Sequence, residues 1–327
     1  MAITLDNTNR LFTLTTKNSM YQMKADKYDV LLHTYYGKKT AFFDYSRQIA
    51  YLDHGCSGNP YEVGHDRPYS LDVLPIEYST FGTGDYRSSA LKVRYANGGF
   101  SCDLRYVGFE VKKGKYSLPG LPAFYATEDV TADTLIITLE DTCKKFYVHL
   151  YYGVMEEYDL ITRAVVIENH SDEIIHLENV QSMCLDFMNG NFDFHTFYGR
   201  YAKEREYERR PMNHGIQTIG STRGTSSHHQ NPFFMITDSN ATEETGNCYG
   251  FSFVYSGDFI GTAELDCFSQ TRVLMGIHPD NFDWCLAPGE SFHSPEVAMT
   301  YSANGMEKLS HNYHKAIRDN LCRGKHK

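Results

Sequence analysis

The chain has 327 residues, of which 41% are hydrophobic, and its 31 basic and 41 acidic residues give a formal charge of −10. This length and hydrophobic content exclude a disordered protein and allow one large domain or two ordinary ones. Because the chain is acidic and has no polybasic tail, nucleic acids and anionic membranes are unsuitable partners, and a neutral ligand is expected.

The first residues, "MAITLDNTNRLFTL", lack a secretory pattern, and the sequence has no run of about 18 apolar residues. A cytoplasmic protein is therefore expected. The eight cysteines include no C-x-x-C pair, which argues against a thiolate zinc site or a redox motif. They are predicted to be reduced and mostly buried, and no metal or other cofactor is expected.

Short strands dominate the predicted secondary structure. Residues 19–36 alternate as two paired strands, and "TLIITLEDTCKKFYVHLYYGV" (residues 134–154) predicts a hairpin with its turn near Asp141. Residues 160–187 repeat this pattern around the turn sequence "NHSDE". Further strands are expected between residues 249 and 301. The 25 tyrosines and 20 phenylalanines suit such a β-rich protein.

The stretch "YGRYAKEREYERRP", residues 198–211, is densely charged. As a strand, it would place Glu204, Glu206 and Glu208 on one face and Arg205, Tyr207 and Arg209 on the other. Neither face suits a hydrophobic core, so the simplest interpretation is a salt-bridged surface ladder.

Residues 212–234 are rich in Gly, Ser, His and Asn, and they predict a loop with many hydrogen-bonding groups. The adjacent His228 and His229 would point to opposite faces of a strand and could not share a metal. A hydrolase triad is disfavoured because G-x-S-x-G is absent.

Only the C-terminal part has helical periodicity, which predicts an amphipathic helix that stops before Gly324. On it, His311 and His314 have i, i+3 spacing, but no third metal ligand is in sight. The apolar positions of this helix are Met306, Leu309, Tyr313, Ile317 and Leu321.

The predicted fold is all-β: a β-super-sandwich of two large antiparallel sheets packed face to face. Residues 1–303 would form this sandwich and residues 304–327 a linker helix. The alternative is two smaller β-domains with a boundary near residues 85–100.

Asp53 is the carboxylate whose surroundings best suit sugar chemistry. It lies in "YLDHGCSGNPY", where an aromatic and apolar strand meets a Gly-rich loop. A carboxylate in that position can accept two sugar hydroxyls, although the same sequence suits an Asp that only forms a turn.

Several long motifs resemble the N-terminal region of the α-galactosidases of glycoside hydrolase family 36. They are "GRYAKEREYERRPMNHGIQTIGSTRGTSSHHQNPFF", "GNCYGFSFVYSGDF", "QTRVLMGIHPDNFDWCLAPGESFHSPE" and "LCRG". The resemblance runs from about residue 18 to the end. It implies a β-super-sandwich followed by a (β/α)8 barrel, into which the last helix would lead.

The resemblance also implies functional roles. The family's two catalytic aspartates lie in the barrel and match no aspartate of this chain, so no catalytic residue is expected here. Its members often form tetramers in which this domain reaches a neighbour's active site. The position of Asp53 contacts the terminal galactose, and so does a residue at the start of the Arg-rich stretch, either Arg200 or Tyr201. Relatives often carry Trp at the position of Tyr201.

The leading hypothesis is thus the non-catalytic N-terminal domain of a retaining α-galactosidase. It would act as a scaffold, support oligomerisation and complete a neighbour's galactose pocket, with a galactoside and its own barrel as partners. Two alternatives remain: a free-standing carbohydrate-binding module and a mutarotase-like epimerase.

Overall fold

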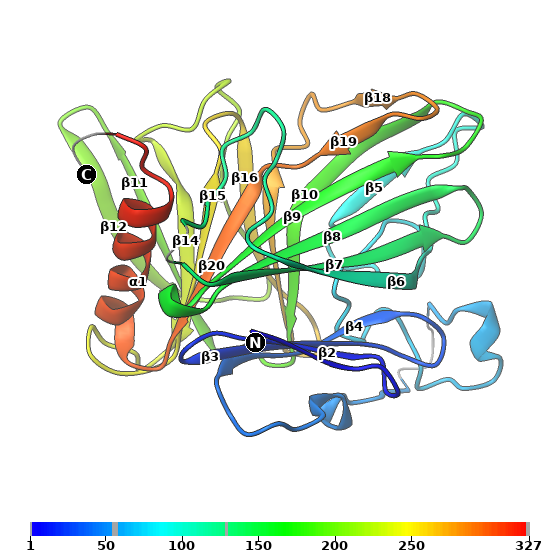
Figure 1. Ribbon diagram of the computed structural model, residues 1–327, viewed down its shortest axis with the longest axis horizontal. Helices are drawn as coiled ribbons and strands as arrows, with labels where there is room; N and C mark the ends of the chain where they lie inside the picture. The colour runs from blue at the N-terminus through cyan, green and yellow to red at the C-terminus, as the bar shows by residue number, and fades with distance from the viewer. Residues whose placement is uncertain (1, 54–57, 128–129, 325–327) are drawn as a thin grey trace.

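The computed structural model describes residues 2–53, 58–127 and 130–324, and its 20 strands form three antiparallel sheets (Figure 1). The largest sheet has ten strands in the order β12-β11-β14-β15-β20-β9-β8-β7-β6, with β19 paired to β9. Its strands are β6 (Leu104–Lys113), β7 (Ala132–Asp141), β8 (Phe146–Met155), β9 (Leu160–Asn169), β11 (Phe192–Arg200), β12 (Lys203–Pro211), β14 (Gln230–Asp238), β15 (Cys248–Val254), β19 (Ser291–His293) and β20 (Glu296–Ser302).

The second sheet has six strands in the order β13-β16-β17-β10-β18, with β5 also paired to β10. They are β5 (Leu91–Arg94), β10 (Ile175–Phe187), β13 (Gly215–Ser221), β16 (Phe259–Leu265), β17 (Thr271–Ile277) and β18 (Trp284–Leu286). A third sheet of four strands runs along the lower side in Figure 1. It comprises β1 (Ile3–Asp6), β2 (Leu11–Thr15), β3 (Ser19–Ala25) and β4 (Leu31–Lys38).

One hydrophobic core joins the three sheets. Leu14 of β2, Ile137 of β7 and Met183 of β10 belong to the same buried cluster, and each is 0% exposed. Burial of such a side chain stabilises the fold by about 1.5–3 kcal/mol. Residues 90–93 contribute to this cluster as well, so residues 85–100 do not separate two domains. The predicted class, with its large antiparallel sheets, is confirmed.

The two local hairpin predictions are confirmed, but the third is wrong. Strands β3 and β4 pair directly, and β7, which ends at Asp141, pairs with β8. By contrast, β9 pairs within the ten-stranded sheet, whereas β10 lies in the six-stranded sheet. The chain crosses between sheets at Asn169, whose side-chain amide donates to the carbonyls of Glu173 (2.9 Å) and Leu286 (2.8 Å).

The charged stretch is a hairpin rather than one strand. Its first three residues complete β11, and its last nine form β12, the exposed edge strand of the ten-stranded sheet. The predicted loop of residues 212–234 is also partly wrong, because residues 215–221 form β13 and pair with β16. Alternation is weak in "GIQTIGS", which hides this strand. His228 and His229 lie in a turn with ring centroids 4.8 Å apart.

The predicted helix is α1 (Gly305–Asn320), and it ends before Gly324. It packs on the outer face of the ten-stranded sheet (Figure 1). There, the Tyr313 hydroxyl donates to the Ala298 carbonyl at 2.9 Å, and the Asn312 amide donates to the Thr300 hydroxyl at 3.0 Å. Within the described part of the chain, no helix has the length and apolarity to cross a membrane.

Among the described residues, three short 3-10 helices also occur: η1 (Tyr45–Gln48), η2 (Tyr61–Val63) and η3 (Glu156–Tyr158).

The burial of the cysteines differs from the prediction. All seven that the structure describes are free thiols, but Cys143, Cys267, Cys285 and Cys322 are exposed and only three are buried. Cys143, Cys267 and Cys322 lie outside the strands, and Cys285 is the middle residue of the three-residue strand β18, on an exposed face.

Candidate functional site

Asp53 lies in irregular backbone between β4 and the six-stranded sheet, within the Asp53 segment (residues 39–53 and 58–70). Its carboxylate accepts from the Arg67 guanidinium at 3.0 Å, and the two side chains are 43% and 62% exposed. The carboxylate therefore faces solvent beside a cation. This pair could exchange its mutual contact for the hydroxyls of a sugar, because an exposed ion pair contributes only about 0–1 kcal/mol.

The Asp53 segment also exposes several apolar side chains. Tyr61 is 96% exposed and Phe42 61% exposed, and Phe43, Tyr51 and Leu52 are exposed as well. So many exposed aromatic groups within one short segment are typical of a surface that contacts another chain or a ligand.

An open cavity of about 450 Å³ adjoins Tyr51. Tyr69 closes one side, and its hydroxyl donates to Asp26 at 2.5 Å. Burial and the neighbouring Asp26 raise the pKa of this phenol well above its usual range. The lining carries both charge signs and a phenol ring, which suits a polyhydroxylated ligand; it consists of Lys24, Asp26, Lys27, Leu32, Ser46, Tyr51, Asp66 and Tyr69.

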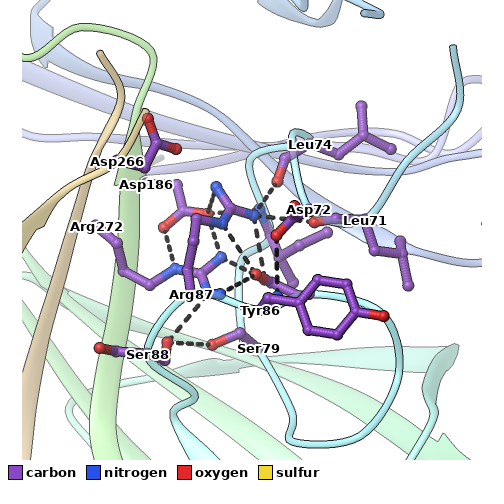
Figure 2. A network of polar contacts seen from close by, with 12 residues as sticks. Leu71, Asp72, Leu74, Ser79, Tyr86, Arg87, Ser88, Asp186, Asp266 and Arg272 are labelled. Carbon is purple, nitrogen blue, oxygen red and sulfur yellow. Dashed lines mark hydrogen bonds and ion pairs between the residues drawn. The ribbon is translucent and has the colours of Figure 1, made fainter. Parts of the chain in front are cut away.

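A buried network fixes the chain that follows the Asp53 segment (Figure 2). Arg87 donates to the carbonyls of Leu71 at 3.0 Å and Leu74 at 2.8 Å. Asp186 of β10 accepts from the Ile76 amide at 2.9 Å. These contacts tie residues 71–76 to the six-stranded sheet and so set where the Asp53 segment emerges.

The centre of this network consists of two arginines and two aspartates. Arg272 makes two 2.7 Å hydrogen bonds to Asp186 and a 2.7 Å ion pair with Asp85, and Arg87 binds Asp85 at 2.9 Å. Burial alone would raise the pKa of Asp186, but Arg272 and Arg87 outweigh it and hold that pKa below its usual range. We call Asp85, Arg87, Asp186 and Arg272 the Asp186 network.

Arg200 and Tyr201 lie at the tip of the β11–β12 hairpin. Arg200 pairs with Lys203, and Tyr201 occupies the two-residue turn with its side chain 85% exposed. Ala202 has a φ of +61°, and its amide donates to Glu204 at 3.0 Å, which closes the turn. The Tyr201 ring is thus free to stack on a flat apolar face such as that of a sugar.

The structure does not bring Asp53 and the hairpin tip together. In Figure 1, the hairpin of β11 and β12 stands at one end of the molecule, and the chain following β4 runs below the four-stranded sheet toward the other end.

A second open cavity, of about 510 Å³, lies between α1 and the strands of the hairpin side. The helical spacing predicted which face of α1 is apolar, but not that part of this face would border a cavity. Its lining includes Phe197, Tyr207, Phe233, Met306, Leu309, Tyr313 and His314. His311 lies 3.9 Å from Glu307.

The His33–Glu77 pair is the most buried His/Glu pair among the described residues. Its side chains are 3% and 0% exposed, and Glu77 also binds Arg163 at 3.0 Å and the hydroxyls of Tyr21 and Tyr152 at 2.6 and 2.7 Å. A pair so enclosed cannot reach a sugar, and it stabilises the interior instead.

The comparisons with known proteins agree with this architecture. Residues 29–287 match the family model described as the glycosyl hydrolase family 36 N-terminal domain. The chain belongs to glycoside hydrolase family 36.

Its relatives in this family are α-galactosidases. Over its full length, the chain is 48% identical to the bifunctional alpha-galactosidase/sucrose kinase AgaSK of Mediterraneibacter gnavus, of which it covers 35%. It is 40% identical to alpha-galactosidase AgaA of Geobacillus stearothermophilus over 99% of the chain and 44% of AgaA. The chain thus spans less than half the length of these two relatives.

Solved structures of the family share the fold. The galactosidase domain of AgaSK superposes with a TM-score of 0.96 at 48% identity, covering 99% of this chain and 45% of that one. A variant of AgaA in complex with raffinose gives a TM-score of 0.94 at 41% identity, covering 96% of this chain and 44% of that one.

Proposed function

We propose that this chain is the N-terminal, non-catalytic β-domain of a longer retaining α-galactosidase that hydrolyses terminal α-galactosyl groups of melibiose- and raffinose-type oligosaccharides. The carrying observation is that the chain matches the family's N-terminal domain along its length but spans only 35–44% of its curated relatives. One relative's structure holds raffinose. The catalytic aspartates would lie in a barrel outside this sequence, and the free thiols of the described cysteines suit a cytoplasmic enzyme.

Asp53 would complete a galactose pocket on a neighbouring chain of a homotetramer. Its carboxylate is accessible and its partner Arg67 is more exposed still, so both can turn toward sugar hydroxyls. The exposed aromatic side chains of the same segment support an interface there, and the Asp186 network gives the segment a rigid base.

The hairpin tip would contribute to a different pocket from the one that Asp53 completes. The Tyr201 ring would stack on the galactose, and Arg200 would bind its hydroxyls. With the tip in one pocket and Asp53 in another, one chain would serve two active sites. An assembly of several chains is then needed for any one site to be complete.

The first test is hydrolysis of an aryl α-galactoside. The 327-residue chain alone should be inactive, and a version extended through the barrel should be active. Activity in a pure preparation of the 327-residue chain would contradict the proposal.

Substitution of Asp53 in the longer enzyme tests the shared pocket. Asp53→Ala should weaken galactoside binding by about ten- to a hundredfold, since a hydrogen bond to a charged group contributes about 1.5–3 kcal/mol. Stability should hardly change, because the Arg67 pair is exposed. Glu110→Ala, which removes another exposed, ion-paired carboxylate, is the matched control and should leave the Michaelis constant unchanged.

Hybrid oligomers distinguish a pocket that two subunits form together from a pocket that lies within one subunit. Chains with Asp53→Ala, mixed with chains that lack the barrel nucleophile, should regain activity where a working barrel meets an intact Asp53. Verified hybrids without activity would mean that Asp53 serves its own subunit or no active site.

The alternatives make different predictions. A free-standing carbohydrate-binding module would bind galactose, melibiose or raffinose with millimolar or tighter affinity in calorimetry of this chain alone. A mutarotase-like epimerase would accelerate the optical rotation change of fresh α-galactose. For this chain alone, we expect no heat of binding in the calorimetric titrations. We also expect no change in the rate at which the optical rotation of fresh α-galactose changes.

A further inference from the structure

A cluster of three potential metal ligands lies on the surface of the six-stranded sheet, at the join of β10 and β18. His176 stands directly opposite Cys285 in the antiparallel register. Asp283 precedes Cys285 by two residues, so its side chain falls on the same face. The His176 Nδ1 atom lies 2.7 Å from Asp283 Oδ1 and 3.5 Å from Cys285 Sγ. We call these three residues the His176 cluster.

We propose that the His176 cluster binds a borderline divalent cation, Zn²⁺ foremost, through His176 Nδ1, Cys285 Sγ and an Asp283 oxygen. Imidazole, thiolate and carboxylate are the three ligand types that Zn²⁺ takes in proteins. Among the described residues, this is the one group of His, Cys, Asp or Glu whose three ligand atoms lie within 4.8 Å of one another.

The present spacing is close to that of a zinc site. Zinc lies about 2.0–2.3 Å from such ligands, so tetrahedral ligand atoms are roughly 3.3–3.7 Å apart. The 3.5 Å between nitrogen and sulfur already fits. The nitrogen and oxygen must separate by about 0.6 Å, which a small rotation of the exposed Asp283 side chain provides. Three protein ligands leave a fourth position for water.

Neighbouring groups orient the Asp283 carboxylate. The Arg94 guanidinium lies 3.1 Å from the other Asp283 oxygen and 2.6 Å from Glu178. It therefore occupies one side of the carboxylate and leaves Oδ1 directed at His176. On binding, the Cys285 thiol would release its proton to solvent, as thiolate ligation requires.

An ordinary His–Asp ion pair would explain the 2.7 Å contact, but it gives no role to the sulfur. Strand geometry gives the third ligand its place: residues 283 and 285 share one face, whereas Trp284 points the other way and packs on Phe292 with centroids 5.3 Å apart. The metal would fasten β18, a strand of only three residues, to the long strand β10.

Trp284 is the single tryptophan of the chain and adjoins two of the proposed ligands, so its fluorescence reports on the site. Chelator-treated chain should bind one Co²⁺ with a near-ultraviolet cobalt–thiolate charge-transfer band and a change in Trp284 emission. Zn²⁺ should displace the cobalt and raise the melting temperature.

Matched variants make the assignment specific. Cys285→Ser should abolish the charge-transfer band and weaken binding at least about tenfold, and His176→Asn should weaken binding to a similar extent. Cys267→Ser removes an exposed thiol outside the cluster and should change neither the band nor the affinity. Absence of the band in the unmodified chain at millimolar Co²⁺, or equal loss in the Cys285 and Cys267 variants, would overturn the proposal. The melting temperatures of the metal-free variants verify that each is folded.

Discussion

Removal of the Asp186 carboxylate should be among the most destabilising single changes in this chain. Asp186 is 2% exposed and accepts from both Nε and Nη2 of Arg272 and from the Ile76 amide. Arg87 Nη1 lies 3.4 Å away. Asp186→Ala would leave two buried guanidinium groups to share the single carboxylate of Asp85.

The expected magnitude follows from this imbalance of charge. Loss of one partner of a buried ion pair costs about 3–5 kcal/mol, mainly because a buried charge is left uncompensated. Asp186→Asn keeps the shape of the side chain, but it removes the same negative charge and turns an NH2 group toward a donor of Arg272 or Ile76, so it should also cost about 3–5 kcal/mol. The measurement is the urea unfolding midpoint at neutral pH, followed by circular dichroism.

Two further variants test the reasoning. Asp72→Ala is the matched control, because this partly exposed carboxylate at the edge of the same region accepts the Tyr86 amide at 3.0 Å and no other hydrogen bond among the described residues. It should cost about 1 kcal/mol. Asp186→Ala with Arg272→Met should cost less than the sum of the single changes, since the second change removes the unpaired charge. A cost below about 1 kcal/mol for Asp186→Ala would refute the reasoning.

The pH dependence should show the same network. Since the folded pKa of Asp186 is lowered, its contribution is fully present above the unfolded value of about 3.9. It is lost as the pH falls through the folded value. The acid limb of unfolding should therefore be shallower for Asp186→Asn than for the unmodified chain.

Two other predictions use the ten-stranded sheet. Burial lowers the pKa of His195 to about 4. Between pH 6.5 and about 4, His195 is therefore protonated in the unfolded chain but neutral in the folded chain. The free energy of unfolding should fall as the pH falls through this window, by up to about 1.4 kcal/mol per pH unit. The urea midpoint of His195→Asn should lack this pH dependence. The same pH dependence in the variant and in the unmodified chain would contradict the assignment. Gly250→Ala should cost about 1–3 kcal/mol by overpacking, because its Cβ would lie 2.8 Å from Tyr313 and 3.0 Å from Leu309 of α1. Gly108→Ala, in an open strand position, is its control, and equal costs for the two would refute the packing argument.

Local sequence patterns predicted the elements of this fold better than their partners. Alternation in residues 134–154 sufficed for a hairpin because both strands and the turn are contiguous. The chain around Asn169 has the same local pattern, yet its two strands enter different sheets. What separates the cases is a set of contacts with β17, β18 and β5, which are remote in sequence. Alternation specifies the buried face of a strand, but it carries no information about the neighbouring strand.

The same limit applies to buried charge. Arg272 and Asp186 are 86 residues apart in sequence, and each stands in an otherwise apolar strand. Locally, either could be an outward-facing residue of a half-exposed sheet. Only the folded register places them opposite each other, and only then does their burial become tolerable. No local pattern predicted the His176 cluster either, because His176 is more than 100 residues from Asp283 and Cys285 in sequence.

Asp53 and Asp186 show why the local sequence does not distinguish an exposed carboxylate from a buried one. Both follow an aromatic or apolar run, in "YLD" and "CLD". Asp186 is enclosed by two arginines, and a sugar would have to displace strong buried contacts to reach it. Asp53 has an exposed pairing with Arg67, and hydroxyls can replace such a contact at little cost. Accessibility therefore distinguishes the two carboxylates, and under the proposed function Asp53 is the one that a galactose hydroxyl could reach.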